Sequence, residues 1–261
     1  MRLTKLILEQ FRNHQKLEID FDAAEPLTYI VGPNAQGKTN ILEAIYLLAL
    51  TKSFRGVKPE EMIGWDFEFA RVQGFFTEQA SPTGAHKSQN GLYKPKNDPK
   101  SVPGHTSETI ALETFLGKPP HQLKAFKKNG VKTSATHFIG NCQVVFFHPE
   151  DLNMLYLGPD LRRAHLNIIN TQINRKYFAA LRSYHKVLKQ RNALLKAIRD
   201  QRAHEAELNI WDEQLIEHGN YLIAQRKNTI EYFQEKLTAT YQKISQGEEK
   251  DRKSTRLNSS H

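Results

Sequence analysis

One stretch of the chain sets its class: Gly32-Pro33-Asn34-Ala35-Gln36-Gly37-Lys38-Thr39, followed by Asn40, has the spacing G-x-x-x-x-G-K-[ST]. In such a loop the glycines let the backbone turn tightly, so that its N–H groups converge on phosphate oxygens. Lys38 is expected to reach the β- and γ-phosphates, and the Thr39 hydroxyl to bind Mg²⁺. Residues 32–40 are therefore predicted to bind a nucleoside triphosphate.

The residues on either side of this loop fit the same interpretation. Residues 27–31 (LTYIV) are apolar and β-branched, which predicts a buried strand leading into the loop. Residues 40–50 (NILEAIYLLAL) predict an apolar helix whose N-terminus faces the phosphates. Strand, loop and helix together indicate an α/β fold of the P-loop NTPase class.

Composition indicates the kind of partner, the cellular compartment and the role of the cysteine. The formal charge of +9 and the pI near 9.5 favour a polyanionic partner. The sequence has no run of about 18 apolar residues and no signal-peptide pattern, which predicts a cytoplasmic protein without a membrane span. The single cysteine, Cys142, precedes an apolar run and is interpreted as a core thiol.

Periodicity predicts the other elements. Alternation over residues 2–21 indicates two strands with residues 11–14 (FRNH) between them, and residues 70–77 indicate another strand. Residues 123–133 carry an Asn-Gly hairpin signal, and residues 143–147 predict one more buried strand. Residues 78–109 are polar and are predicted to form a long variable loop, whereas helical periodicity runs from residue 161 to about residue 240.

The first part of the helical region is strongly basic. Residues 161–199 contain ten Lys or Arg residues and no Asp or Glu. Solvated helices usually interleave both signs, so a run without counter-charge favours contact with nucleic acid over a merely solvated face. The candidate DNA-contacting residues are Arg162, Arg163, Arg182, Lys186, Lys189 and Arg191.

Four patterns, in order along the chain, resemble the RecF family, bacterial recombination-mediator ATPases related to the SMC proteins. The first is residues 6–14 (LILEQFRNH), and the second is residues 32–40 with KSFR at 52–55. The third is residues 147–152 (FHPEDL), continuing to Arg162 and Arg163. The fourth is residues 189–196 (KQRNALLK), with WDEQL at 211–215 and Gly219 after it.

The resemblance implies an ABC/SMC-like ATPase head with an inserted helical lobe. Residues 1–150 would form the ATP-binding lobe, 151–240 the helical lobe, and 241–250 the start of a return to the ATPase lobe. Arg12 and Asn13 would form a turn that approaches the nucleotide, with an exposed polar turn as the alternative. Glu150 lies near the position of the Q-loop in relatives, although they have glutamine there.

The functional implications of the resemblance are equally specific. It implies an ATP-dependent homodimer that binds single-stranded or gapped DNA in recombinational repair, replication and the SOS response. ATP and Mg²⁺ would be the cofactors, and RecR and RecO the protein partners.

The sequence departs from the family pattern in two respects. Ala35 stands where many relatives have glycine, so the loop is expected to work if Ala35 has a negative φ. The signature motif and the Walker B acid, which the family carries further along, are absent, so the catalytic residues are unknown. Residues 1–250 are accordingly expected to show no ATPase activity above a Lys38→Ala control.

The last eleven residues, 251–261 (DRKSTRLNSSH), match an in-frame translation of a common sequencing-library adapter. They contribute three cations and one anion, so the chain stays basic without them. We interpret them as an artefact and expect the natural reading frame to continue where they begin. Two alternative functions stay open: a small-molecule phosphotransferase, or a fragment that binds ATP without hydrolysing it.

Overall fold

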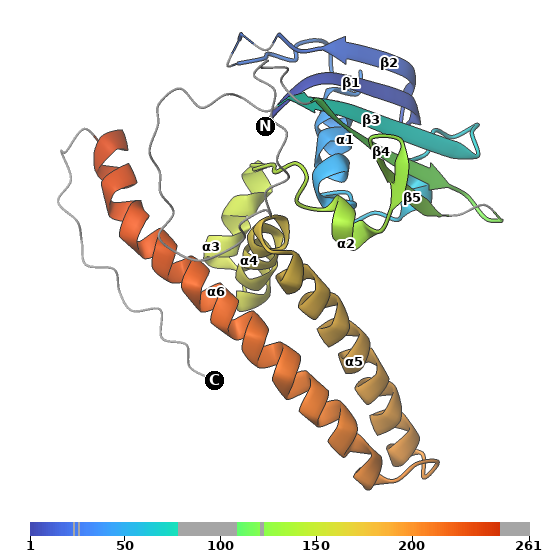
Figure 1. Ribbon diagram of the computed structural model, residues 1–261, viewed down its shortest axis with the longest axis vertical. Coiled ribbons are helices and arrows are strands. Elements are labelled where there is room, and N and C mark those ends of the chain that lie inside the picture. Colours follow the sequence, from blue (N-terminus) through green and yellow to red (C-terminus); the bar gives the residue numbers. More distant parts are fainter. Residues whose placement is uncertain (23, 26, 78–108, 121–122, 246–261) are drawn as a thin grey trace, which may run out of the picture. The chain divides into compact units, whose positions relative to one another are not determined.

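The computed structural model describes residues 1–22, 24–25, 27–77, 109–120 and 123–245 (Figure 1). The chain divides into two compact units, residues 1–147 and the residues from His148 onward. Nearly all of the variable loop predicted at 78–109, part of the segment predicted at 241–250, and residues 251–261 lie outside the described residues.

A six-stranded antiparallel sheet forms the first unit, in the order β2-β1-β3-β4-β5-β6 (Figure 1). The strand pair predicted over 2–21, the strand over 70–77 and the Asn-Gly hairpin are confirmed, with Asn129 and Gly130 at φ 51° and 78° in the hairpin turn. Strand β4 was not predicted. The strands are β1 (Arg2–Phe11), β2 (His14–Asp20), β3 (Phe69–Thr77), β4 (Thr109–Gly117), β5 (Lys124–Lys128) and β6 (Val131–Thr133).

The predicted helix after the loop is also confirmed, as α1 (Lys38–Leu50), which packs on one face of this sheet. Alternate residues of the sheet point at it and are buried, among them Leu8 in β1, Val72 in β3 and Leu112 in β4. Gly74 permits the close approach, because a Cβ there would lie 2.6 Å from Leu48 Cδ1. The position of α1 therefore depends on a glycine, which has no side chain, at position 74 of β3.

The two strands predicted at 27–31 and 143–147 are wrong. Both segments are outside the six-stranded sheet, and alternate apolar residues are exposed rather than buried, with Val31 at 85% and Val145 at 97%. A strand exists only when a neighbour satisfies its backbone groups. No described strand pairs with either segment, so high β-propensity alone does not make them strands.

Two short helices and a buried thiol complete the first unit. Helix η1 (Pro59–Met62) follows α1, and α2 (Ala135–Phe138) follows β6. Cys142 lies just beyond α2, and burial raises the pKa of its thiol to about 12. The thiol is thus protonated and unreactive near neutral pH, which fits a core residue.

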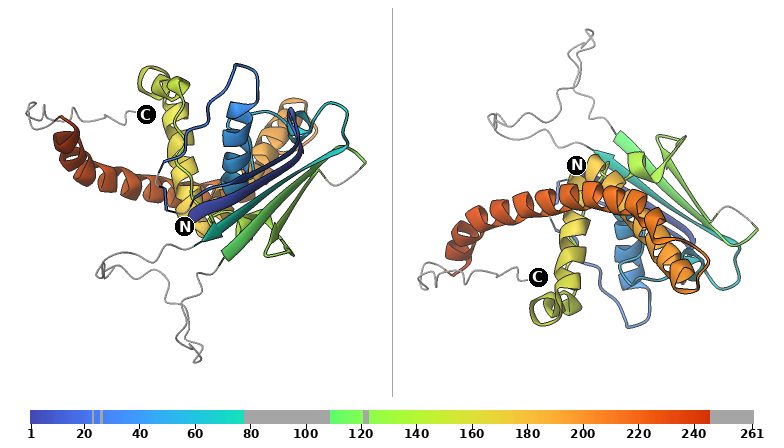
Figure 2. Two further views of the ribbon diagram at one scale, coloured as in Figure 1. Left: turned by 90° about the horizontal axis from the view of Figure 1, so that it is seen from above. Right: turned by 90° about the horizontal axis from the view of Figure 1, so that it is seen from below.

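Helices make up the described part of the second unit. Helices α5 and α6 pack along each other, and α6 curves along its length (Figure 2). At their junction with α4, the hydroxyl of the buried Tyr177 donates to Asn167 Oδ1, which also accepts from Arg226 Nη2 at 2.9 Å. The helices are η2 (Pro149–Leu152), α3 (Asn153–Tyr156), α4 (Pro159–Ile173), α5 (Arg175–Arg199), η3 (Glu205–Glu207) and α6 (Leu208–Ile244).

Candidate nucleotide and nucleic-acid sites

The predicted phosphate loop is an exposed turn that leads directly into α1. Gly37, with φ 90°, precedes the helix, and Lys38 is its first residue. The Lys38 ammonium donates to the carbonyl oxygens of Gly32 and Pro33 at 2.7 and 2.6 Å, which closes the loop into a ring. The lysine thereby holds a positive charge at the mouth of the loop.

The N-terminus of α1 is suited to an anion. The first amide N–H groups of a helix have no carbonyl partner within the helix, and no side chain caps those of α1. The helix dipole adds partial positive charge at the same point. Thr39 is exposed in this first turn, beside Lys38. The residues present therefore fit a phosphate group with an accompanying Mg²⁺.

Ala35 departs from what the sequence analysis required. Its φ is 65°, in the left-handed region, rather than negative. A residue with a Cβ pays about 1–2 kcal/mol in this conformation, whereas glycine does not. The loop therefore forms with local backbone strain at this position.

The turn between β1 and β2 lies against the phosphate loop. Asn13 Oδ1 accepts a hydrogen bond of 2.8 Å from Asn40 Nδ2, and His14 Nε2 lies 3.2 Å from the Gly37 carbonyl oxygen. A Cβ on Gly37 would come within 2.4 Å of Asn13 Oδ1 and 2.5 Å of His14 Nε2. Gly37 is thus required twice, by its positive φ and by the approach of this turn.

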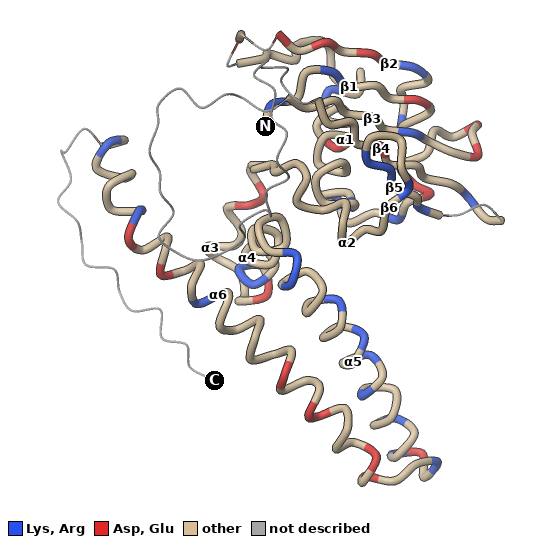
Figure 3. The backbone as a smooth tube through the Cα atoms, viewed as in Figure 1, with Lys and Arg blue, Asp and Glu red and all other residues tan. Residues whose placement is uncertain are grey.

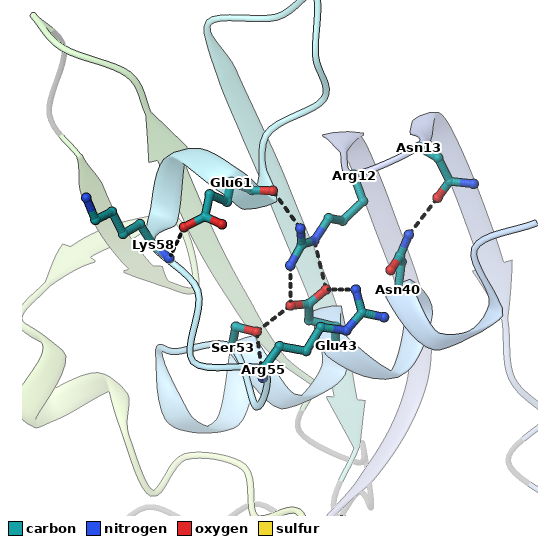
Figure 4. Close-up of polar contacts among 8 residues, drawn as sticks. All are labelled: Arg12, Asn13, Asn40, Glu43, Ser53, Arg55, Lys58 and Glu61. Atoms are coloured by element: carbon teal, nitrogen blue, oxygen red, sulfur yellow. Dashed lines mark hydrogen bonds and ion pairs between the residues drawn. The ribbon is translucent and has the colours of Figure 1, made fainter. Parts of the chain in front are cut away.

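Arg12 is tied inward, to the buried carboxylate of Glu43 in α1 (Figure 4). Its Nε and Nη2 donate to Oε2 and Oε1 of Glu43 at 2.9 and 2.7 Å, and its Nη1 donates to the carbonyl oxygen of Glu61 at 2.7 Å. Arg12 itself has φ 55°. These bonds brace the turn against α1 and leave Asn13, rather than Arg12, beside the phosphate loop.

Glu43 also fixes the segment that follows α1. The Ser53 hydroxyl donates to Glu43 Oε1, and Arg55 Nη1 lies 3.5 Å from Oε2. One buried carboxylate thus joins the β1–β2 turn, the phosphate-loop helix and residues 53–55 (Figure 4). The charge is compensated by two guanidinium groups, which a fully buried anion requires.

The six predicted DNA-contacting residues divide into two groups. Arg162 donates to the carbonyl oxygens of Met154 and Leu157, Arg163 pairs with Asp160, and Arg191 pairs with Asp212. Their charges are at least partly used within the helical unit. The second group is exposed on α5 and consists of Lys186, Lys189 and Arg182, of which Arg182 also holds its guanidinium carbon 5.8 Å from the centre of the Phe178 ring.

Lys176 and Arg199 are exposed at other positions around α5, whereas the other five exposed cations follow one face of the helix. Successive spacings of seven, four, three and seven residues keep their Cα positions within less than a quarter turn of each other, over about 30 Å. We call these five residues the α5 stripe: Arg175, Arg182, Lys186, Lys189 and Lys196. Lys and Arg recur along α5, whereas α6 carries both positively and negatively charged residues (Figure 3).

Glu150, which the resemblance places near the Q-loop position, lies in η2 with its side chain 84% exposed.

Two residues around the candidate nucleotide site, Glu43 and His14, are not among the predicted site residues. Glu43 had a signal, because it is the only charged residue in the apolar run of residues 41–50. His14 had no such signal, since its contact with Gly37 depends on how the β1–β2 turn lies against the loop.

Among the helices that the structure describes, none combines the length and the apolar character that a membrane span requires.

Comparison with known proteins agrees with this geometry. Residues 5–250 match the AAA domain family. The chain is 34% identical over 251 residues to the "DNA replication and repair protein RecF" of Halalkalibacterium halodurans, covering 96% of this chain and 59% of that one. The RecF of Bacillus thuringiensis is 33% identical over 248 residues, with 95% and 58% covered. The chain thus spans somewhat more than half the length of these relatives.

The chain is also similar to solved structures of RecF proteins. A structure of the recombination mediator protein RecF with ATPrS superposes with a TM-score of 0.77 at 31% identity, covering 94% of this chain and 58% of that one. One with ATP gives a TM-score of 0.76 at the same identity and coverage. The predicted P-loop ATPase fold is thereby confirmed. The chain belongs to the AAA domain family, and within it is similar to the DNA replication and repair protein RecF.

Proposed function

We propose that this chain binds ATP with Mg²⁺ at residues 32–40. The observation that carries the proposal is the uncapped N-terminus of α1 with Lys38 closed over the loop. Lys38 would bind the β- and γ-phosphates, and the Thr39 hydroxyl would hold Mg²⁺, which supplies charge neutralisation when bound. Similarity to a RecF structure described with ATP supports the choice of nucleotide.

Titration with a fluorescent ATP analogue tests this site. Lys38→Ala is expected to abolish saturable binding, because it removes the cation that meets the terminal phosphates. Lys16→Ala is the matched control: it removes an equally sized charge from an exposed position on β2 and should bind like the parent chain. Equal affinity in the Lys38→Ala variant and the parent would refute the site.

We further propose that α5 contacts DNA in replication and recombinational repair. The α5 stripe supplies cations at intervals suited to a phosphate backbone, and relatives named for DNA replication and repair support the choice of polyanion. The finer proposals follow the RecF resemblance. They are preference for single-stranded or gapped DNA, ATP-controlled homodimerisation, a role in the SOS response, RecR and RecO as partners, and action in the cytoplasm.

Salt dependence tests the DNA proposal. Each phosphate contact releases counterions, so log Kd depends linearly on log salt concentration. Lys186→Gln with Lys189→Gln is expected to weaken binding and to flatten this slope by about one unit for each lysine. Lys227→Gln on α6 removes an exposed, paired cation and serves as the control. An unchanged slope in the double variant would refute assignment of these lysines to phosphates.

A further inference from the structure

A groove between α5 and α6 adjoins the α5 stripe. On α6 it is lined by Trp211, Gln214 and His218, whose spacings of three and four residues place them on one face of the helix. On α5 it is lined by Lys186 and Gln190, among others. The groove therefore combines an indole ring with two primary amides, an imidazole and a cation.

The floor and rim of the groove differ in character. Val187 is buried, with 5% of its surface exposed, and contributes an apolar floor. Lys186 and Gln190 are exposed, whereas Trp211, Gln214 and His218 are half-buried. A flat apolar ring with hydrogen-bonding edges matches this combination, because it stacks on an indole and exchanges hydrogen bonds with amides.

Among the residues that line the groove, Lys186 is the one Lys or Arg and none is Asp or Glu, which favours an anionic ligand. Lys186 belongs both to the groove and to the α5 stripe, so a ligand in the groove has cations beside it along α5. The nearest carboxylate in sequence to Trp211, that of Asp212, is paired with Arg191 Nε at 2.5 Å. That acidic neighbour is therefore compensated, and the exposed Glu213 and Glu217 of α6 are not among the residues that line the groove.

We propose that this groove binds one unpaired base of single-stranded DNA while the α5 stripe binds the adjoining phosphates. The base stacks on Trp211, and Gln190 and Gln214 exchange hydrogen bonds with its edge. A duplex does not satisfy the groove, because its bases are stacked and paired within the helix. The inference rests on the proposed contact between α5 and DNA, and it specifies the strandedness of that DNA.

Tryptophan emission tests the groove directly, because the chain contains two tryptophans, Trp65 and Trp211. Trp65 is in the first unit and 95% exposed, so Trp65→Phe leaves Trp211 as the single reporter at little structural cost. We expect oligothymidylate to quench this emission saturably. Fluorescence anisotropy of a labelled oligonucleotide, measured on the same samples, reports binding independently of the groove.

A variant series then measures the contribution of stacking. Trp211→Leu is expected to weaken oligothymidylate binding about 5- to 150-fold, the range for loss of one stacked base. Trp211→Phe keeps an aromatic face and should restore most of that loss. Far-ultraviolet circular dichroism and the thermal midpoint of each variant establish that the α5–α6 pair is folded. Equal losses in the Leu and Phe variants would overturn stacking.

Three comparison ligands separate the remaining outcomes. An oligonucleotide of abasic sugar-phosphate that quenches as fully as oligothymidylate would overturn base recognition. Free thymidine monophosphate quenching at the same concentration as the oligonucleotide would overturn a site for strands. A duplex that quenches equally would overturn the requirement for an unpaired base.

The groove and the wider DNA proposal fail in distinguishable ways. Anisotropy that saturates without any change in Trp211 emission overturns the groove and leaves DNA binding by α5 intact. Absence of an anisotropy change with every nucleic acid, at low salt, refutes the DNA proposal itself.

Discussion

At the scale of single residues, Glu43 explains how the segments around the candidate nucleotide site are held together. Its carboxylate is buried and bonded to Arg12, Ser53 and Arg55, which come from segments on both sides of α1. A polar residue in a buried helix face is tolerated only when its partners are present. The position of the β1–β2 turn therefore depends on this side chain.

Glu43→Ala should destabilise the chain by about 3–5 kcal/mol, because it leaves Arg12 partly buried without its anion. Urea unfolding followed by circular dichroism measures the change. Glu68→Ala, at an exposed position in the same unit, is the control and should stay within about 0.5 kcal/mol of the parent. A Glu43→Ala loss as small as the control's would contradict a bracing role.

Substitution of Ala35 is predicted to stabilise the chain rather than to destabilise it. Ala35→Gly removes the penalty of a left-handed Cβ, so we expect a stabilisation of about 0.5–1 kcal/mol after the entropic cost of glycine. Nucleotide affinity, measured with the fluorescent analogue, should be equal or tighter. Loss of stability on this substitution would contradict the positive φ.

At the scale of elements, the contact between α1 and β3 sets where the phosphate loop lies. The helix begins at the loop, and its other end packs over Gly74 through Leu48. Protein interiors are close-packed, so a single added methyl group displaces the helix or strains the strand.

Gly74→Ala should cost about 1–3 kcal/mol in the free energy of unfolding, because its Cβ would lie 2.6 Å from Leu48 Cδ1 and 2.9 Å from Phe76 Cε2. In a Leu48→Ala background the same substitution should cost less, since the nearer of these two atoms, Leu48 Cδ1, is gone. A double-mutant cycle by urea unfolding measures this coupling. Additive effects would contradict direct contact between the two residues.

At the scale of the whole molecule, the described chain consists of two units with different chemistry. The sheet unit carries the candidate nucleotide site, and the helical unit carries the α5 stripe. Separate cores allow each unit to unfold on its own.

Differential scanning calorimetry should resolve two transitions, of which Mg²⁺-ATP raises only one. At a free ligand concentration of 100 times Kd, the shift corresponds to about 2.7 kcal/mol of added stability. Lys38→Ala should remove the shift without moving the other transition. A single transition, or equal shifts in both, would contradict independent units.

The sequence alone was sufficient for the features that depend on local pattern. The phosphate-loop motif, the helix after it, five of the six strands in outline and the long helices all have a spacing that neighbouring residues determine. Residues 32–40 can be proposed as a site from sequence alone, because the chemistry of a phosphate cradle is contained in one short segment.

Only the tertiary structure decided the features that depend on partners distant in sequence. Residues 27–31 and 143–147 have strand propensity but no described strand beside them, and Ala35 takes a φ that its residue type disfavours. Arg12 is paired with Glu43. Three of the predicted DNA-contacting residues are bonded within the helical unit, namely Arg162, Arg163 and Arg191. Lys186 and Trp211, which are distant in sequence, line the same groove. Propensity and charge are properties of a residue, whereas pairing, burial and compensation are properties of what the fold brings next to it.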